Sequence, residues 1–158
     1  MIREEFRIFL IDVSTGQGKT VLLDGRNEVA GGSGLAAVLY RRYGKPELPW
    51  DDESQPLIFA IGPLTGYFPL MSKMVCSFKS NYHGEYTESH AGGRAALSLR
   101  FCDLDALVIV GRARQLSCLN IGAHHLELRE TSFMQGMDAA SSGKLIRRIF
   151  KGGSGHRS

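Results

Sequence analysis

The sequence predicts an α+β domain, and three observations support this fold class. Segments with strand character and segments with helix character follow one another in the order strands, helix, strands, helix, strands, helix. This order lacks the regular strand–helix–strand alternation that is typical of a doubly wound parallel sheet. The 158 residues amount to one ordinary domain, and 43% of them are hydrophobic, so the chain can build a core. We therefore expect about three helices packed against β-structure.

The first third of the chain predicts a hairpin and a helix. Residues 5–13 alternate apolar and polar side chains, and a second strand at 19–25 follows the turn sequence STGQGK. Residues 31–44 show helical spacing of apolar side chains, with basic residues in the last turn. Ser33 is the expected N-cap of this helix, and Gly44 its expected end.

The middle of the chain predicts more strands and a second helix. The strands are expected at 57–61, 72–80, 85–89 and 105–111. The first of them runs into the turn sequence GPLTG at 62–66. The last is apolar enough to be buried on both faces. The helix is expected over 91–103, directly after the stretch TESH.

The last third predicts a second hairpin and a third helix. The hairpin joins 116–122 and 125–130, and the helix over 137–150 is amphipathic and basic. The tail 151–158, KGGSGHRS, has no hydrophobic residue and is expected to be flexible or a truncated linker. We therefore place one domain at 1–150.

Composition and charge exclude several classes of protein. A net charge of +3 is small and spread along the chain, so no nucleic-acid partner is expected. No stretch approaches the ~20 apolar residues of a membrane span, and the N-terminus is too acidic for a signal peptide, so we expect a cytoplasmic protein without membrane contact. The three widely spaced cysteines, Cys76, Cys102 and Cys118, predict buried reduced thiols rather than a disulfide scaffold or a metal cluster.

The stretch TESHAGGRAA at 87–96 is the first candidate site. A glycine pair at the start of a predicted helix leaves backbone N–H groups open to close approach, and the helix dipole adds partial positive charge. Gly92 and Gly93 closely follow His90, and Arg94 adds charge, so the pattern favours phosphate or another anion. GGSGLAA at 31–37 has the same form. Plain structural turns remain the alternative for both glycine pairs.

Six motifs together resemble one known family. GGSGLAA, LIFAIGPLTG, FKS, SHAGG, LRF and DALVIVGRA, in this order and at these spacings, resemble the N-terminal domain of the aldehyde ferredoxin oxidoreductase family over about residues 6–150. The resemblance implies two β-sheets in a pseudo-twofold arrangement. It also implies a tungsten (or molybdenum) ion held between two pterins, whose phosphates are linked through a magnesium ion.

The resemblance assigns roles to particular residues. It implies that Lys73, at a position usually occupied by Arg, contacts the pterin, and that the backbone carbonyl of His90 binds magnesium. The cofactor-binding residues it implies are Lys73, His90, Ala91, Gly92, Gly93 and Arg94. No catalytic residue is assigned to this chain. An exposed edge-strand lysine, and a histidine that caps a helix or faces solvent, remain the alternatives for the first two.

The resemblance also implies a function shared with other domains. The complete enzyme would oxidise aldehydes to carboxylic acids and pass the electrons through a [4Fe–4S] cluster to ferredoxin. That cluster is expected only in domains outside this chain, so this chain alone is expected to be inactive. Its expected partners are those domains or a partner subunit. Two alternatives stay open: a non-catalytic pterin-cofactor carrier, and a structural protein that binds a partner through the basic helix. An apolar face at Tyr67, Phe68, Leu70 and Met71 favours a homo-oligomer through the pterin side.

Overall fold

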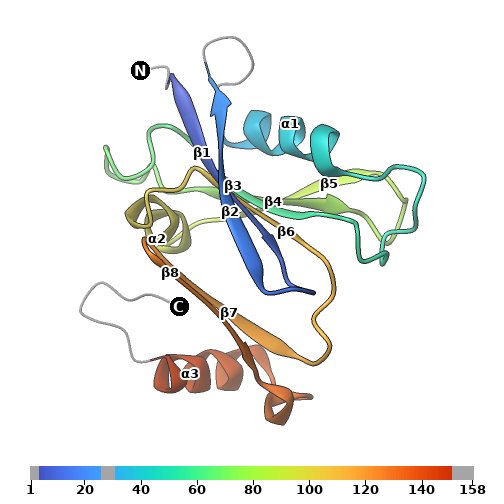
Figure 1. The fold of residues 1–158 in the computed structure, drawn as a ribbon. Coiled ribbons are helices and arrows are strands. Elements are labelled where there is room, and N and C mark those ends of the chain that lie inside the picture. The colour runs from blue at the N-terminus through green and yellow to red at the C-terminus, as the bar shows by residue number, and fades with distance from the viewer. Residues whose placement is uncertain (1–3, 26–30, 151–158) are drawn as a thin grey trace.

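A computed structural model describes residues 4–25 and 31–150 of the protein. Within these residues the chain forms three α-helices, one short 3-10 helix and two β-sheets of six and two strands (Figure 1). The predicted α+β class, with two sheets and three helices, is confirmed. The pseudo-twofold relation between the sheets and the limits of the domain remain predictions, and the tail 151–158 lies outside the described residues.

The larger sheet has the strand order β2-β1-β6-β3-β4-β5. Its strands are β1 (Glu5–Asp12), β2 (Gln17–Asp24), β3 (Leu57–Ile61), β4 (Met74–Lys79), β5 (Tyr86–Ala91) and β6 (Ala106–Val110). Neighbouring strands are antiparallel, except that β1 and β6 are parallel. The predicted hairpin of β1 and β2 is confirmed. At the centre of the sheet β6 is buried on both faces over its first three residues, as its apolar sequence predicts.

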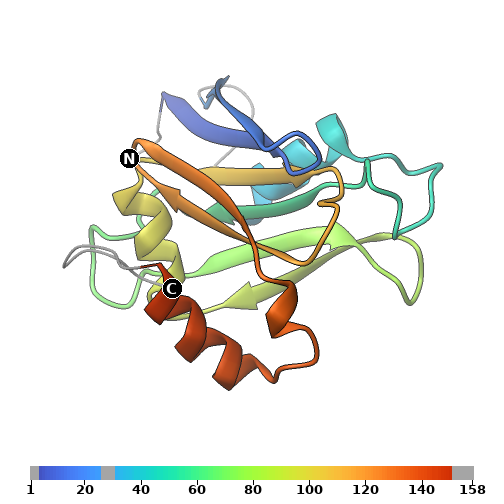
Figure 2. The same ribbon diagram turned by 60° about the horizontal axis from the view of Figure 1, so that its bottom comes forward.

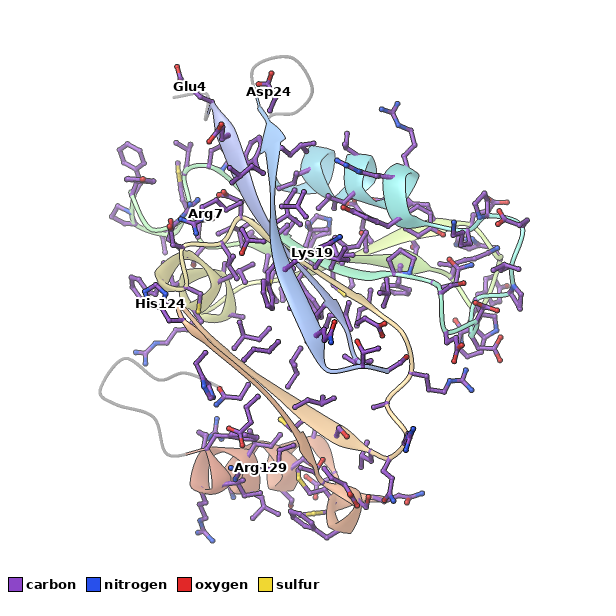
Figure 3. The ribbon with its side chains drawn as sticks, in the orientation of Figure 1. Glu4, Arg7, Lys19, Asp24, His124 and Arg129 are labelled. Atoms are coloured by element: carbon purple, nitrogen blue, oxygen red, sulfur yellow. The ribbon has the colours of Figure 1, made fainter. Side chains whose placement is uncertain are left out.

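A hairpin and a helix cover one face of this sheet. Strands β7 (Ser117–Gly122) and β8 (His125–Glu130) form the predicted second hairpin, and η1 (Ser132–Met134) leads on to α3 (Ala139–Ile149). Figures 1 and 2 show the β7–β8 hairpin across the large sheet on the side opposite α1, with α3 outside it. Arg129 (Figure 3) belongs to β8, and its Cζ lies 4.9 Å from the centroid of the ring of Phe150, which follows α3.

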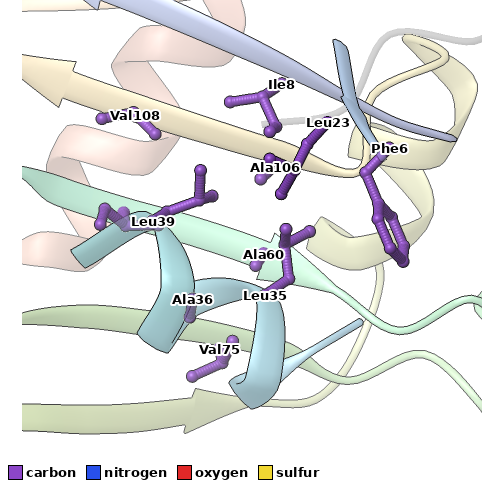
Figure 4. Packing of buried hydrophobic residues seen from close by; sticks show 11 residues of the cluster. Phe6, Ile8, Leu23, Leu35, Ala36, Leu39, Ala60, Val75, Ala106 and Val108 are labelled. Carbon is purple, nitrogen blue, oxygen red and sulfur yellow. The ribbon is translucent and has the colours of Figure 1, made fainter. Parts of the chain in front are cut away.

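Helix α1 (Ser33–Tyr43) covers the other face and builds the core. Its Leu35, Ala36 and Leu39 are fully buried, because they recur at helical spacing on the side that faces the sheet. They pack on apolar residues of five strands (Figure 4): Phe6, Ile8, Leu23, Ile58, Ala60, Val75, Ala106 and Val108. This packing fixes the position of the first turn of α1 relative to the end of the sheet.

The glycine pair 92–93 does not start a helix, and this prediction is wrong. Strand β5 continues to Ala91, because its residues pair with β4 from Tyr86 through His90 to Ala91. The pair therefore lies in a loop, and α2 (Ala95–Phe101) begins only at Ala95 and has seven residues. The ladder with β4 outweighs the weak helical pattern of residues 91–94, since glycine is a poor helix former.

Two predictions about single side chains are also wrong. Ser33 is not the N-cap of α1, because Gly32 holds that position and the Ser33 hydroxyl donates a hydrogen bond to Glu88 instead. The three cysteines are free, as predicted, but half-buried rather than buried. No helix of the described residues is long and apolar enough to cross a membrane.

Candidate cofactor-binding site

A depression of about 320 Å³ lies where β3 ends and α1 begins. Four parts of the chain line it: the GGSG loop before and at the start of α1, the GPLTG loop after β3, the segment entering β4, and His90 of β5. The lining residues are Gly32, Ser33, Gly62, Pro63, Leu64, Thr65, Met71, Lys73, Val75 and His90. Two of the six predicted cofactor-binding residues, Lys73 and His90, are therefore brought together.

The two glycine-rich motifs interlock at this place. The Gly32 N–H donates to the Ile61 carbonyl at 3.0 Å, and a Cβ on Gly31 would lie 2.7 Å from Pro63 Cδ. Both Gly31 and Gly32 have positive φ, at 96° and 58°. The local turn alone therefore requires glycine at both positions, and the Gly32 N–H is already paired within the protein. By contrast, a Cβ on Gly62 would meet nothing within 4 Å, so the backbone there is open toward a ligand.

The first turn of α1 supplies partial positive charge to the depression. Gly32 and Ser33, at the start of the helix, both line it, and no side chain caps the helix. The first N–H groups of a helix have no partner within it, and the helix dipole makes this end attractive to anions. A helix start with free backbone N–H groups, as predicted for a glycine pair, therefore follows the pair 31–32 and does not follow the pair 92–93 directly.

Lys73 and His90 add cationic and polar side chains to the same wall. Lys73 directly precedes β4, and His90 of β5 pairs with Val75 of β4, so all three lie along one edge of the depression. Lys73 is exposed to solvent. His90 Nε2 lies 3.0 Å from Glu88 Oε2. The exposed ammonium group can pair with an anion that enters the depression.

The other four predicted cofactor-binding residues do not line the depression. Ala91, Gly92, Gly93 and Arg94 are not among the described residues that line the depression. A Cβ on Gly92 or Gly93 would meet nothing within 4 Å, so the loop backbone there is open. The predicted open backbone therefore exists at 92–93, but as a loop after β5 rather than the first turn of a helix.

The Glu88 side chain connects two residues that line the depression, Ser33 of α1 and His90 of β5. The sequence did not predict this role. The Glu88 carboxylate accepts hydrogen bonds from Ser33 of α1 at 2.8 Å and from Tyr86, and it contacts His90. The hydrogen bond from Tyr86 is the main cause that lowers the pKa of Glu88 below its usual value. Burial, followed by the Glu88 contact, raises the pKa of Tyr86. The sequence feature that could have predicted this role is the alternation Tyr86-Thr-Glu88-Ser-His90, which puts three polar side chains on one face of a strand.

Arg100 and Asp105 were also missed as contributors to the site. Arg100 donates hydrogen bonds to two backbone carbonyls of the GPLTG loop, and its side chain is paired with the buried Asp105. Both residues lie in the motifs LRF and DALVIVGRA, and membership of these motifs was the only signal in the sequence.

The donors of the depression suit an organic anion more than a bare metal ion. Within residues 4–25 and 31–150 no three His, Cys, Asp or Glu side chains are grouped so as to hold a metal. The depression instead offers open glycine backbone, a helix N-terminus and an exposed ammonium group, which together match phosphate. Its volume is at the lower end of the range of ligand pockets, which run from about 300 Å³ upward. These observations fit the phosphate-bearing end of a larger cofactor.

The fold and this depression define an α+β domain with a largely apolar cleft between the GGSG and GPLTG loops, with Lys73 and His90 at one wall. Residues 8–156 match the family model described as aldehyde ferredoxin oxidoreductase, N-terminal domain. The chain belongs to this family, as the six motifs indicated.

Relatives and a solved structure agree with this assignment. The chain is 30% identical to the tungsten-containing aldehyde ferredoxin oxidoreductase of Pyrococcus furiosus and 27% identical to that of Thermococcus kodakarensis. Each match covers 90% of this chain but 24% of the relative, so the chain spans about a quarter of their length. A solved active-site complex, BamBC of benzoyl coenzyme A reductase with 1,5-dienoyl-CoA, superposes with a TM-score of 0.85 and 26% identity. That match covers 94% of this chain and 23% of the solved one.

Proposed function

We propose that this domain forms the base on which a tungsten–pterin cofactor lies. The observation that carries the proposal is the depression itself, which gathers GGSG, GPLTG, Lys73 and His90 from four separate parts of the sequence. Two of these motifs supply backbone rather than side chains, as expected where a phosphate must approach closely. The names of the two relatives describe them as tungsten-containing enzymes, which supports tungsten as the metal for the present chain.

Different residues of the depression would bind different parts of the cofactor. The first turn of α1 and the Lys73 ammonium group would attract its phosphates, and Gly62 leaves room beside them. The backbone carbonyl of His90 would bind magnesium, a role that tolerates any side chain because only the oxygen is needed. Gly92, Gly93 and Arg94 would extend the same surface from the neighbouring loop. When bound, the cofactor supplies two-electron redox chemistry at its metal, and this domain orients it.

The activity of the whole protein is proposed from its family. We propose oxidation of an aldehyde to a carboxylic acid, with ferredoxin as electron acceptor and a [4Fe–4S] cluster in other domains. The domain alone would not catalyse this, since a single wall cannot exclude water from a reacting cofactor. The solved benzoyl coenzyme A reductase complex favours a second candidate, in which the same base serves a reductase of a coenzyme A ester. A cofactor carrier without catalysis is the third.

Cofactor binding tests the proposal directly. The 158-residue chain would be mixed anaerobically with bis-pterin cofactor released from a tungsten enzyme, and bound metal measured after gel filtration. We expect binding by the parent chain and a loss of about three- to tenfold in affinity for Lys73→Ala, since one exposed charge pair is removed. Lys19→Ala is the matched control, because Lys19 is an exposed lysine on β2 and does not line the depression (Figure 3).

Two results would contradict the proposal. Either the parent chain retains no cofactor, or Lys73→Ala and Lys19→Ala bind it equally. Binding followed by ready transfer to an apoenzyme would favour the carrier over the oxidoreductase domain.

A further inference from the structure

Arg100 of α2 hydrogen-bonds to the GPLTG loop but does not itself line the depression. Its Nε donates to the Thr65 carbonyl and its Nη2 to the Gly62 carbonyl, each at 3.2 Å. Gly62 and Thr65 both line the depression, whereas Arg100 does not. Only 11% of the Arg100 side chain is exposed, so these bonds are largely shielded from water.

The same guanidinium group is anchored to the centre of the sheet. Its Nη1 donates to Asp105 Oδ1 at 3.0 Å, and Asp105 is fully buried. The second carboxylate oxygen accepts from the Arg7 N–H of β1 at 2.9 Å. The backbone of Asp105 also binds β1 and β3, through Arg7 and Ile61. Asp105 therefore provides a fixed point, and Arg100 connects that point to two carbonyls of the loop.

Apart from its packing against Gly31 at Pro63 and the burial of Thr65, the loop has few polar constraints within the described structure. Its own turns contribute the Thr65 N–H bond to Gly62 and the Tyr67 N–H bond to Leu64, both at 3.1 Å. Gly66 has a φ of 83°, and a Cβ added to it would contact Leu97 and Arg100 of α2. From Tyr67 to Met71 the side chains are exposed. The guanidinium is thus the main polar tie between the loop and the body of the domain.

We propose that Arg100 is a positioning residue of the cofactor site. By bonding to the Gly62 and Thr65 carbonyls it keeps the GPLTG loop in the shape that forms one wall of the depression. This inference rests on the proposed function, because the wall matters only if a cofactor lies against it. Arginine suits this role because its rigid planar fork reaches three acceptors at once, whereas a lysine ammonium is a single point charge on a flexible stem.

The variant Arg100→Lys keeps the positive charge but lacks the planar guanidinium group. Lysine retains a positive charge opposite Asp105, so the buried carboxylate is not left alone, but it cannot hold both loop carbonyls as well. Arg129→Lys is the matched control: Arg129 also pairs with a carboxylate and lies over an aromatic ring, but on β8 of the second sheet (Figure 3). If Arg100→Lys does not fold, the double variant Arg100→Met, Asp105→Asn removes both buried charges together.

Two readouts on the intact 158-residue chain test the inference. Amide hydrogen exchange at Thr65 and Tyr67 reports on the loop without any ligand, and we expect it to quicken about tenfold in Arg100→Lys and to be unchanged in Arg129→Lys. Affinity for bis-pterin cofactor, measured by the same gel-filtration assay, should fall about five- to tenfold in Arg100→Lys alone.

The outcomes distinguish this inference from the proposed function. Unchanged loop exchange overturns the inference, and so does faster exchange with unaltered cofactor affinity, which would make Arg100 purely structural. In both cases binding by the parent chain would leave the proposed function standing. Failure of the parent chain to bind cofactor would instead overturn the proposed function and, with it, the positioning role.

Discussion

At the scale of single residues, Gly31 makes the sharpest prediction about stability. Its φ of 96° is strained for other residues, and a Cβ would lie 2.7 Å from Pro63 Cδ. We expect Gly31→Ala to lower the free energy of unfolding by about 1–3 kcal/mol, measured by urea denaturation. Gly92→Ala is the control and should change stability by less than about 0.5 kcal/mol, because its Cβ would meet nothing within 4 Å. Equal effects would refute the interlock of GGSG with GPLTG.

The three cysteines give a prediction about pH. Burial raises the pKa of the thiols of Cys76, Cys102 and Cys118 above the usual value. The folded state therefore favours the protonated thiol, which is the unreactive form. At about pH 8 we expect a disulfide reagent to react at least about tenfold more slowly with the folded chain than with the chain in urea. Because the folded pKa is raised, stability should also fall as the pH rises above about 8.5, the ordinary thiol value. Equal rates in both states would contradict this.

Residue roles were only partly predictable from the sequence. Lys73 and His90 do lie together, and their assignment depended on the order of motifs. Glu88 and Arg100 act through hydrogen bonds to partners 55 and up to 38 positions away. Such contacts depend on which strands become neighbours, and no local pattern encodes that.

At the scale of elements, one lysine fastens a long loop to the sheet. Lys79 at the end of β4 is 9% exposed, and its ammonium group donates to the Pro46 and Leu48 carbonyls, both at 2.6 Å. We expect Lys79→Met to cost about 2 kcal/mol of stability, since two carbonyls lose a charged donor. Lys19→Met should be neutral within about 0.5 kcal/mol, because Lys19 itself is exposed on β2. Thermal unfolding followed by circular dichroism measures both, and a neutral Lys79→Met would refute the tether.

The type of secondary structure was predicted correctly where a single hydrophobic pattern dominates the segment. The alternation in β1 and the apolar run in β6 indicated the correct element type, because burial selects those side chains directly. The start of α2 was misplaced, because residues 90–91 pair with β4 and the pairing energy is not visible locally. Asp138, which caps α3 by accepting from the Ser141 N–H at 2.9 Å, followed the ordinary capping rule but was not predicted.

At the scale of the whole molecule, the two faces of the large sheet differ in what they carry. The β7–β8 hairpin and α3 cover one face, and α1 covers the other (Figure 1). Helix α1 also builds the core and begins at the depression. The segment 67–71 adjoins that depression through Met71. As predicted, its large apolar side chains are exposed: Tyr67 by 62%, Phe68 by 57%, Leu70 by 99% and Met71 by 47%.

This apolar segment predicts how the isolated chain behaves in solution. Four neighbouring large side chains in water favour self-association, because burying them against a second copy removes apolar area from solvent. We expect the 158-residue chain to elute ahead of a monomer in gel filtration at high concentration, and Phe68→Ser with Leu70→Ser to restore monomeric elution. Tyr82→Ser is the control, since Tyr82 is 93% exposed in the β4–β5 turn and does not line the depression. A parent chain that stays monomeric by light scattering at high concentration would show that this face needs no partner.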